Sequence, residues 1–296
     1  MPIASLSDVN DAYDNGRYHI QRFYKGANAV ANVPPLWTDW AYAAGQPAYD
    51  ARIGTSGQFN PYVATKNDAI WFPDIPDGMH RRLKRVVLRC GPAAAGQTIT
   101  NAIVYDLLGV YPLIDGDSTD QQDFTNDDPL PRYSDGVGVF PVLVNHVSPM
   151  VVNAGGTMTY TGTDDVDRSV GFGVLLGAPG HAVSCPTTSG SASTNARGPL
   201  CMSLHSGVSG VKAIKNVTFS SAPGGLFSIY MVRPLTTITN HDGASTTEKV
   251  ATEKFLAIQN AWHYPRIHDG AHLGFFINNN ASTLASVYGY LEFIWG

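Results

Sequence analysis

The chain has 296 residues, of which 44% are hydrophobic and only 15% charged, and its formal net charge is −5 at pH 7. This length and hydrophobic content predict a substantial core arranged as one large or two ordinary domains. The acidic balance argues against direct nucleic-acid binding by bulk charge attraction. No apolar run approaches the roughly 20 residues of a membrane-spanning helix, so we expect no membrane partner.

A short helix is predicted at the N-terminus, from Leu6 to Asp14. The Ser5 hydroxyl can cap the first free amides, and Asp8 stands three residues later, as in a capping box. Asn15-Gly16 supplies a stop suited to a left-handed C-terminal cap. Only this one helix is expected in the chain.

The rest of residues 1–79 is predicted to be an extended arm, because six prolines between residues 27 and 78 exclude long helices and long strand ladders. The same segment carries many large aromatic side chains, which are costly to leave in water. We therefore expect the arm to press onto a surface, either that of its own β units or that of a neighbouring subunit.

The remainder of the chain indicates an all-β fold, with short runs of β-branched and aromatic residues separated by turn residues. We predict two tandem, related β-sandwich or jelly-roll-like units, residues 80–177 and 211–296. A Ser/Gly-rich linker or loop, residues 178–210, separates them. A single sandwich with internal pseudo-symmetry is the alternative.

Two internal similarities suggest that the units are copies. Pro131-Arg132-Tyr133-Ser134-Asp135-Gly136 returns as Pro265-Arg266-Ile267-His268-Asp269-Gly270, at an offset of 134 in the numbering (265 − 131). The stretch 105–113 is echoed by 227–235, at an offset of 122 (234 − 112, at the shared proline). Asp-Gly favours a tight turn, and an arginine can satisfy loop carbonyls or pair with a carboxylate. We interpret the hexapeptide as a structural turn at the entry to a strand, formed by Arg132, Asp135 and Gly136 and again by Arg266, Asp269 and Gly270.

No catalytic residues and no cofactor are predicted, because the sequence lacks a phosphate-binding loop, a dinucleotide fingerprint and a nucleophile–base set. Asp115, Asp117 and Asp120 are weak candidates for a calcium site, but the glycine and glutamate of an EF-hand are missing, and a solvated acidic loop is favoured. Paired carboxylates of a glycosidase, with Asp117 or Asp165, are a minor alternative.

Basic residues gather between His80 and Arg89, and Arg81 and Arg82 lie within this cluster. It is interpreted equally as the charged edge of a strand, which discourages edge-to-edge pairing, or as a contact for an acidic partner surface.

Three stretches, residues 108–120, 130–136 and 289–296, resemble tailed-bacteriophage virion proteins. The resemblance implies a non-enzymatic structural protein, most similar to a capsid decoration or cement protein that binds the shell exterior. It implies assembly in the host bacterial cytoplasm, with the major capsid protein and further copies of the chain, as a homotrimer, for partners. A carbohydrate- or host-receptor-binding virion protein and a tail or connector protein are the alternatives. Because interfaces are anchored by aromatic and arginine side chains, the interface candidates are Trp37, Trp40, Trp71, Arg81 and Arg82.

Overall fold

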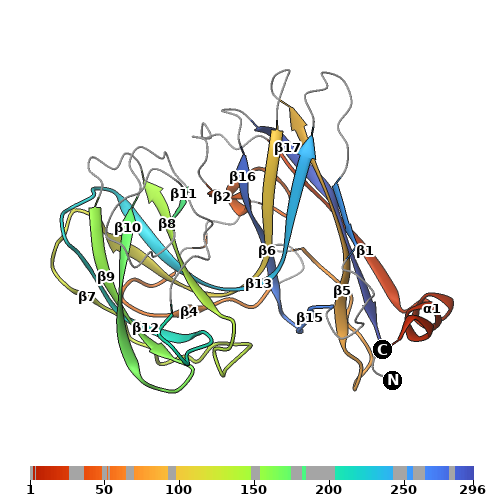
Figure 1. The fold of residues 1–296 in the computed structure, drawn as a ribbon, viewed down its shortest axis with the longest axis horizontal. Coiled ribbons are helices and arrows are strands. Elements are labelled where there is room, and N and C mark those ends of the chain that lie inside the picture. The colour runs from red at the N-terminus through yellow and green to blue at the C-terminus, as the bar shows by residue number, and fades with distance from the viewer. Residues whose placement is uncertain are drawn as a thin grey trace.

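The computed structural model describes residues 3, 5–26, 37–48, 52, 54–64, 70–92, 98–147, 154–174, 182–184, 204–242, 252–255, 264–279 and 284–296. These residues form antiparallel strands with one α-helix and one short 3-10 helix, which confirms the predicted all-β class (Figure 1). The elements are α1 (Leu6–Asp14), β1 (Tyr18–Lys25), β2 (Trp37–Asp39), η1 (Trp40–Tyr42), β3 (Gly45–Gln46), β4 (Asn60–Pro61), β5 (Arg81–Pro92), β6 (Thr98–Asp115), β7 (Gln122–Asp123), β8 (Phe140–Val147), β9 (Ala154–Gly162), β10 (Asp167–Val174), β11 (Ala182–Ser184), β12 (Val211–Phe219), β13 (Leu226–Asp242), β14 (Thr252–Phe255), β15 (Arg266–Ile267), β16 (His272–Asn279) and β17 (Leu284–Trp295).

The N-terminal helix has the predicted bounds and the predicted caps. The Ser5 hydroxyl accepts a hydrogen bond from the backbone N–H of Asp8, and the same hydroxyl donates to the Asp8 carboxylate. At the other end, Gly16 has a φ of 65°, the left-handed conformation that a glycine adopts without strain. No helix among the described residues is long and apolar enough to cross a membrane.

Three sheets make up the described part of the chain. The outer sheet has the order β14-β5-β17-β1-β3, with β15 beside β5, and the small sheet has the order β10-β9-β12-β7. The third runs β13-β8-β11-β2-β16-β6-β4, and β13 also pairs with β6. This last pairing closes six of its strands, β13, β8, β11, β2, β16 and β6, into a ring, which we call the central ring.

The described core has three large clusters, one inside the central ring and one on each side of it, and a fourth, smaller cluster that joins α1 to the end of β17. The strand β6 contributes to the three large clusters: Tyr105 and Leu107 face the ring interior, Ala102 and Val104 face the outer sheet, and Tyr111 faces the small sheet. A strand buried on both faces needs apolar residues at nearly every position, which accounts for the continuous apolar run in this part of the sequence. In Figure 1, β6 and β13 run from one side of the molecule to the other.

The described part of the predicted arm belongs to the sheets of its own chain. The strand β1 lies between β17 and β3 in the outer sheet, and β2 lies between β11 and β16 in the central ring. Of the two surfaces considered for its aromatic residues, these segments use their own β units. Most of the predicted linker 178–210 lies outside the described residues, but residues 182–184 form β11 and close the ring.

The strands of the two predicted units pair with each other. The strand β5 pairs with β17, β6 with β16, β13 with β8, and β12 with β9. Each of these pairs joins one strand from residues 80–177 to one from residues 211–296. The sheets are therefore assembled by exchange between the two stretches, and neither stretch forms a sandwich from its own strands alone.

Strand register shows that the two stretches are structural copies. In the β5–β17 and β12–β9 ladders, equivalent residues are paired with equivalent partners. Both ladders also have a register shift at the same place, directly before Phe293 of β17 and directly before Tyr160, its equivalent in β9. Residues of β5 correspond to residues of β12 at an offset of 131 in the numbering (217 − 86). Residues of β9 correspond to residues of β17 at an offset of 133 (291 − 158). The matching partners are Val86↔Leu291 with Val217↔Met158, Leu83↔Phe293 with Ile214↔Tyr160, and Leu88↔Gly289 with Phe219↔Gly156.

The central strands correct one sequence expectation. The pairing of β6 with β13 is symmetric about Asp106↔Arg233, so equivalent positions there differ by an offset of 127 (233 − 106) and not 122. The pairs Val104↔Phe275 and Met231↔Pro141 are equivalent, because Val104 and Met231 differ by this offset of 127 (231 − 104). Their partners Pro141 and Phe275 differ by 134 (275 − 141), which is the offset between the two hexapeptides. The shared proline was misleading because ladder register is set by facing side chains and bulges rather than by one residue type.

The close approach of backbones in the small sheet gives a testable consequence. A Cβ on Gly156 would lie 2.5 Å from the carbonyl oxygen of Thr218, whereas a Cβ on the adjacent Gly155 would meet nothing closer than 3.4 Å. We expect Gly156→Ala to lower the free energy of unfolding by about 1–3 kcal/mol, because the strands must separate. Gly155→Ala should change it by less than about 0.5 kcal/mol. Urea unfolding of both variants checks this, and equal losses would contradict it.

Candidate functional site

The first copy of the hexapeptide forms a buried ion pair. Arg132 donates from Nε to one carboxylate oxygen of Asp106 at 2.9 Å and from Nη2 to the other at 2.8 Å. Its remaining donors reach the carbonyl oxygens of Leu107 and Tyr62 at 2.7 and 3.0 Å. The backbone N–H of His272 also donates to the Asp106 carboxylate, at 2.9 Å. Both charges are buried, so this network joins β6, β16 and the segment before β8 inside the protein.

The second copy has the same turn but not the same pair. Gly136 and Gly270 both have positive φ, 73° and 70°. Arg266, in contrast, is exposed. At the position equivalent to Asp106 stands Arg233, whose guanidinium stacks on the Tyr133 ring with its carbon 5.1 Å from the ring centre. A cation in that place offers no partner to a second arginine, so the duplication has lost its symmetry at this point.

The two copies touch each other through Tyr133. Its hydroxyl donates to the carbonyl oxygen of Arg266 at 3.4 Å, and its ring lies edge-on to the imidazole of His268 with 4.8 Å between ring centres. Burial raises the pKa of Tyr133 to about 12. The two hexapeptides therefore form two turns that pack against each other. They lie close to the Asp106↔Arg233 pair, about which the pairing of β6 with β13 is symmetric.

The His268 side chain supplies a pH prediction. Burial, and then the charge of Arg266, lowers the pKa of this imidazole below 6.5. Since the folded state binds fewer protons than the unfolded state between the two pKa values, its contribution to stability is complete above pH 6.5 and declines as the pH falls through that window. We expect an NMR titration to give a pKa below 6.5, and Arg266→Ala to raise it part of the way. A pKa at or above 6.5 in the unmodified protein would contradict the assigned burial.

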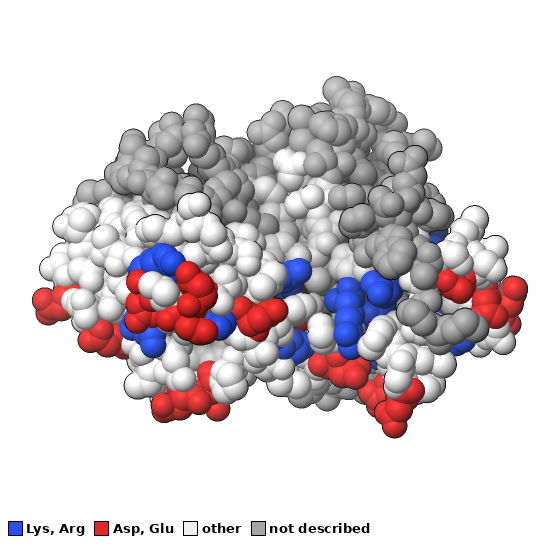
Figure 2. Space-filling model, turned by 60° about the horizontal axis from the view of Figure 1, so that its bottom comes forward, with Lys and Arg blue, Asp and Glu red and all other residues white. Residues whose placement is uncertain are grey.

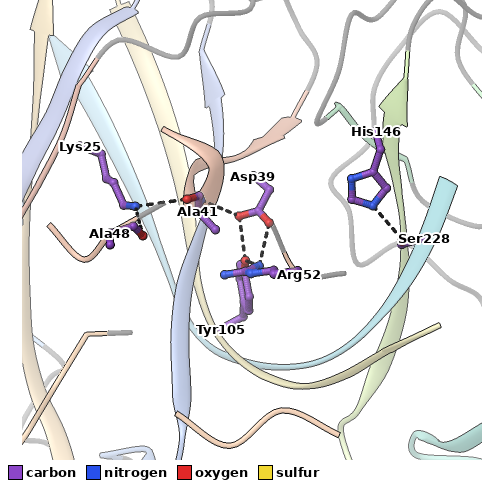
Figure 3. A network of polar contacts seen from close by, with 8 residues as sticks. All are labelled: Lys25, Asp39, Ala41, Ala48, Arg52, Tyr105, His146 and Ser228. Carbon is purple, nitrogen blue, oxygen red and sulfur yellow. Dashed lines mark hydrogen bonds and ion pairs between the residues drawn. The ribbon is translucent and has the colours of Figure 1, made fainter. Parts of the chain in front are cut away.

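A second buried polar network lies around the central ring (Figure 3). The Asp39 carboxylate accepts hydrogen bonds from Arg52 at 2.7 Å, from the Tyr105 hydroxyl at 2.9 Å and from the N–H of Ala41 at 3.1 Å. Arg52 also donates to the Tyr105 hydroxyl at 2.5 Å. Burial is the main reason why the pKa of Tyr105 is raised well above its usual value. The residues of this network are buried, and their hydrogen bonds stabilise the fold.

Buried lysine is rare, and Lys25 at the end of β1 is one. Its ammonium donates to three backbone carbonyls, those of Ala41, Ala43 and Ala48, at 3.1–3.2 Å. Figure 3 shows the contacts with Ala41 and Ala48. These contacts tie the outer sheet to η1 and to the turn that follows it. The predicted arm is thus held by a buried cation as well as by strand pairing.

The interface candidates divide into buried and exposed residues. Trp37 and Trp40 are buried in the cores of their own chain, and Arg81 is buried between Asp269 and the carbonyl oxygen of Pro73. These three side chains are used in packing within their own chain. Trp71 is 37% exposed, and Arg82 is partly exposed while donating to the carbonyl oxygen of Tyr264. Only these two remain available for an interface.

The basic cluster is not on an edge strand. The strand β5 lies inside the outer sheet, with β17 on one side and β14 and β15 on the other. Its charged side chains find partners within the chain, such as Lys84 with Glu292 at 3.6 Å. In the view of Figure 2, a compact group of basic side chains lies among acidic ones, so this face carries both signs of charge.

The acidic loop uses its oxygens to shape its own backbone. The Asp115 carboxylate accepts from the N–H of Asp117 at 2.8 Å, and the Ser118 hydroxyl accepts from the N–H of Asp120 at 3.1 Å. Such side-chain-to-backbone bonds are typical of turns. Within the described residues, no group of three or more His, Cys, Asp or Glu is placed to hold a metal ion. Asp165, considered for a glycosidase, lies in another loop and pairs with Lys212 at 2.6 Å.

An open groove lies on the outward face of the outer sheet, which sequence reasoning did not identify. Its volume is about 660 Å³. The side chains that line it come from four neighbouring strands, β5, β17, β1 and β3, and three of these side chains are tyrosines. The alternation of tyrosines in the last strand was the available signal, but that strand was interpreted only as an apolar strand docked into a sheet. The lining residues are Gln21, Arg22, Phe23, Tyr24, Gln46, Val87, Tyr288, Gly289 and Tyr290.

Comparison with known proteins leaves the family open. No protein-family model matches the chain, and no curated protein matches it. Among solved structures, the infectious bursal disease virus VP2 subviral particle aligns over 94% of this chain and 80% of its own, with 11% identity and a TM-score of 0.20. The T13 particle of the same virus aligns over 93% and 77%, with 12% identity and a TM-score of 0.19. Such low TM-scores do not establish a shared fold.

Proposed function

We propose that the chain is a non-enzymatic structural protein of a virion, specifically a capsid decoration protein that binds the shell exterior and stabilises contacts between capsid subunits. The observation that carries the proposal is the interleaved fold. The ladders β5–β17, β6–β16, β6–β13, β8–β13 and β9–β12 all join the two copies, and β6 and β13 run through both sides of the molecule. Force applied to one side is therefore transmitted through backbone hydrogen bonds to the other, as a clamp between subunits requires.

The sequence resemblance to tailed-bacteriophage virion proteins supports the same proposal. It favours the major capsid protein as the partner, assembly in the host bacterial cytoplasm, and a homotrimer whose head-to-tail contacts close a ring. The exposed Trp71 and the partly exposed Arg82 are the proposed anchors on the shell, since aromatic and arginine side chains dominate binding energies at interfaces.

Electron microscopy of virions that contain the chain tests this proposal. We expect density for the chain on the outer surface of the shell, and lower occupancy with Trp71→Ala. Val166→Ala is the control, because Val166 is 49% exposed at the β9–β10 turn, in the small sheet and not in the outer sheet beside which Trp71 lies. Density in a ring at the tail would favour a tail or connector protein, and density at fibre tips would favour receptor binding. Either position would overturn the decoration proposal.

A further inference from the structure

The open groove of about 660 Å³ on the outer sheet has the size of a small-ligand site. Elsewhere this sheet face is covered: Val9 and Ala12 of α1 pack together with Ile294 near its end. The groove lies farther along the same strands, where Tyr24 is 53% exposed. One part of the face is thus closed by the chain itself, and the tyrosine-lined part is open.

Strand register places the groove side chains in two neighbouring rows. Gln46, Tyr24 and Tyr288 face one another across β3, β1 and β17, and Arg22 faces Tyr290 across β1 and β17. Directly paired side chains lie on the same side of a sheet with their Cβ atoms about 5 Å apart. The groove therefore presents tyrosine rings side by side, with an amide at one end and a guanidinium in the next row.

Among the described side chains that line the groove, Arg22 is the only charged one. It is exposed and makes no ion pair with another described residue. The guanidinium carbon of Arg85 lies 5.4 Å from the centre of the Tyr290 ring, at the border of the groove. Glu292, the next residue of β17 on this face, is buried and bonded to Tyr13, with Lys84 at 3.6 Å. The groove is therefore complementary to an anion, although the whole chain is acidic.

We propose that this groove binds an acidic saccharide. Pyranose rings have apolar C–H faces, which stack on tyrosine rings, and hydroxyls that exchange hydrogen bonds with an amide such as that of Gln46. The carboxylate of a sugar acid matches the planar donors of Arg22. Tyrosine rings without a nearby cation would suit a neutral sugar equally well, so the arginine selects the acidic class. The inference is independent of where the chain lies on a virion.

Calorimetric titration of the full chain with trigalacturonic acid and with disialic acid tests the proposal, with neutral galactotriose for comparison. We expect at least one acidic probe to bind about tenfold or more tightly than the neutral one. Arg22→Gln should remove this preference, and Tyr288→Ala should weaken binding of the acidic probe about three- to tenfold. Tyr18→Ala is the matched control, because Tyr18 is an exposed tyrosine on β1, the strand that carries Arg22, but it lies outside the groove.

Several results would overturn the proposal. These are failure of both acidic probes to bind, equal binding of the neutral probe, and binding that Tyr288→Ala and Arg22→Gln leave unchanged. Circular dichroism of each variant separates loss of binding from loss of folding. Sedimentation velocity adds a further check: if Tyr288→Ala dissociates an oligomer and no acidic probe binds, the groove is a contact between copies of the chain. That outcome would refute saccharide binding without deciding the decoration proposal, which the position of the chain on the particle tests.

Discussion

Arg132→Ala is expected to lower the free energy of unfolding by about 3–5 kcal/mol, because it leaves the buried Asp106 carboxylate without its counter-charge. The variant also removes the donors to the carbonyl oxygens of Leu107 and Tyr62. The free energy of unfolding of Arg132→Lys should lie between that of Arg132→Ala and that of the unmodified protein, since an ammonium cannot form the bidentate contact. Urea unfolding followed by tryptophan fluorescence measures the differences.

The duplication supplies the control for this experiment. Arg266 occupies the equivalent position in the second hexapeptide but is exposed, so Arg266→Ala should change the free energy of unfolding by no more than about 0.5 kcal/mol. A similar loss in both variants would mean that the repeat acts through its turn alone. A loss confined to Arg132→Ala would assign the effect to the buried pair with Asp106.

Asp39→Ala is expected to have an effect of similar size, about 3–5 kcal/mol, because Arg52 would be left charged and buried. The Tyr105 hydroxyl and the N–H of Ala41 would lose an acceptor at the same time. The double variant Asp39→Ala/Arg52→Met should recover part of the loss, since it removes the second buried charge of the pair as well. Thermal and urea unfolding of both variants measure this. No recovery in the double variant would show that lost packing, and not charge, is responsible.

Asp165 provides the comparison at the surface. Its contact with Lys212 is 2.6 Å long, against 2.7 Å for Asp39 with Arg52, but the Asp165 side chain is 76% exposed and that of Asp39 is 0% exposed. Asp165→Ala should cost no more than about 1 kcal/mol, because water already solvates both partners. A loss as large as that of Asp39→Ala would mean that distance, rather than burial, decides the energy of these pairs.

Much of the local structure could be predicted because it depends on neighbouring residues. The helix from Leu6 to Asp14 follows from a capping hydroxyl, an acidic residue three positions later and a glycine at the stop. The strands β5, β6 and β12 appear where β-branched residues concentrate. The spacing between the two hexapeptides is preserved in the pairing of β8 and β16 with the central strands.

The candidate site was predictable only in part. A tryptophan in a proline-rich segment is equally compatible with an interface and with a core, and Trp40 is 1% exposed while Trp71 is 37% exposed. The same ambiguity applies to Arg81, which is buried and donates a hydrogen bond to Asp269, a residue far away in the sequence. The groove tyrosines could not be assembled in advance, because they come from both ends of the chain.

The sequence by itself determined the all-β class, the helix from Leu6 to Asp14 with its caps, and the presence of a duplication, because helix caps, strand periodicity and turns are set by residues close together in the chain. The tertiary structure alone decided that the two copies exchange strands, that Arg132 is buried while Arg266 is exposed, and that Tyr24 meets Tyr288 at an open groove. These features depend on the pairing of residues that are far apart in the chain. In such pairing, register and burial are selected by how whole sheets pack, and no short stretch of sequence records that choice.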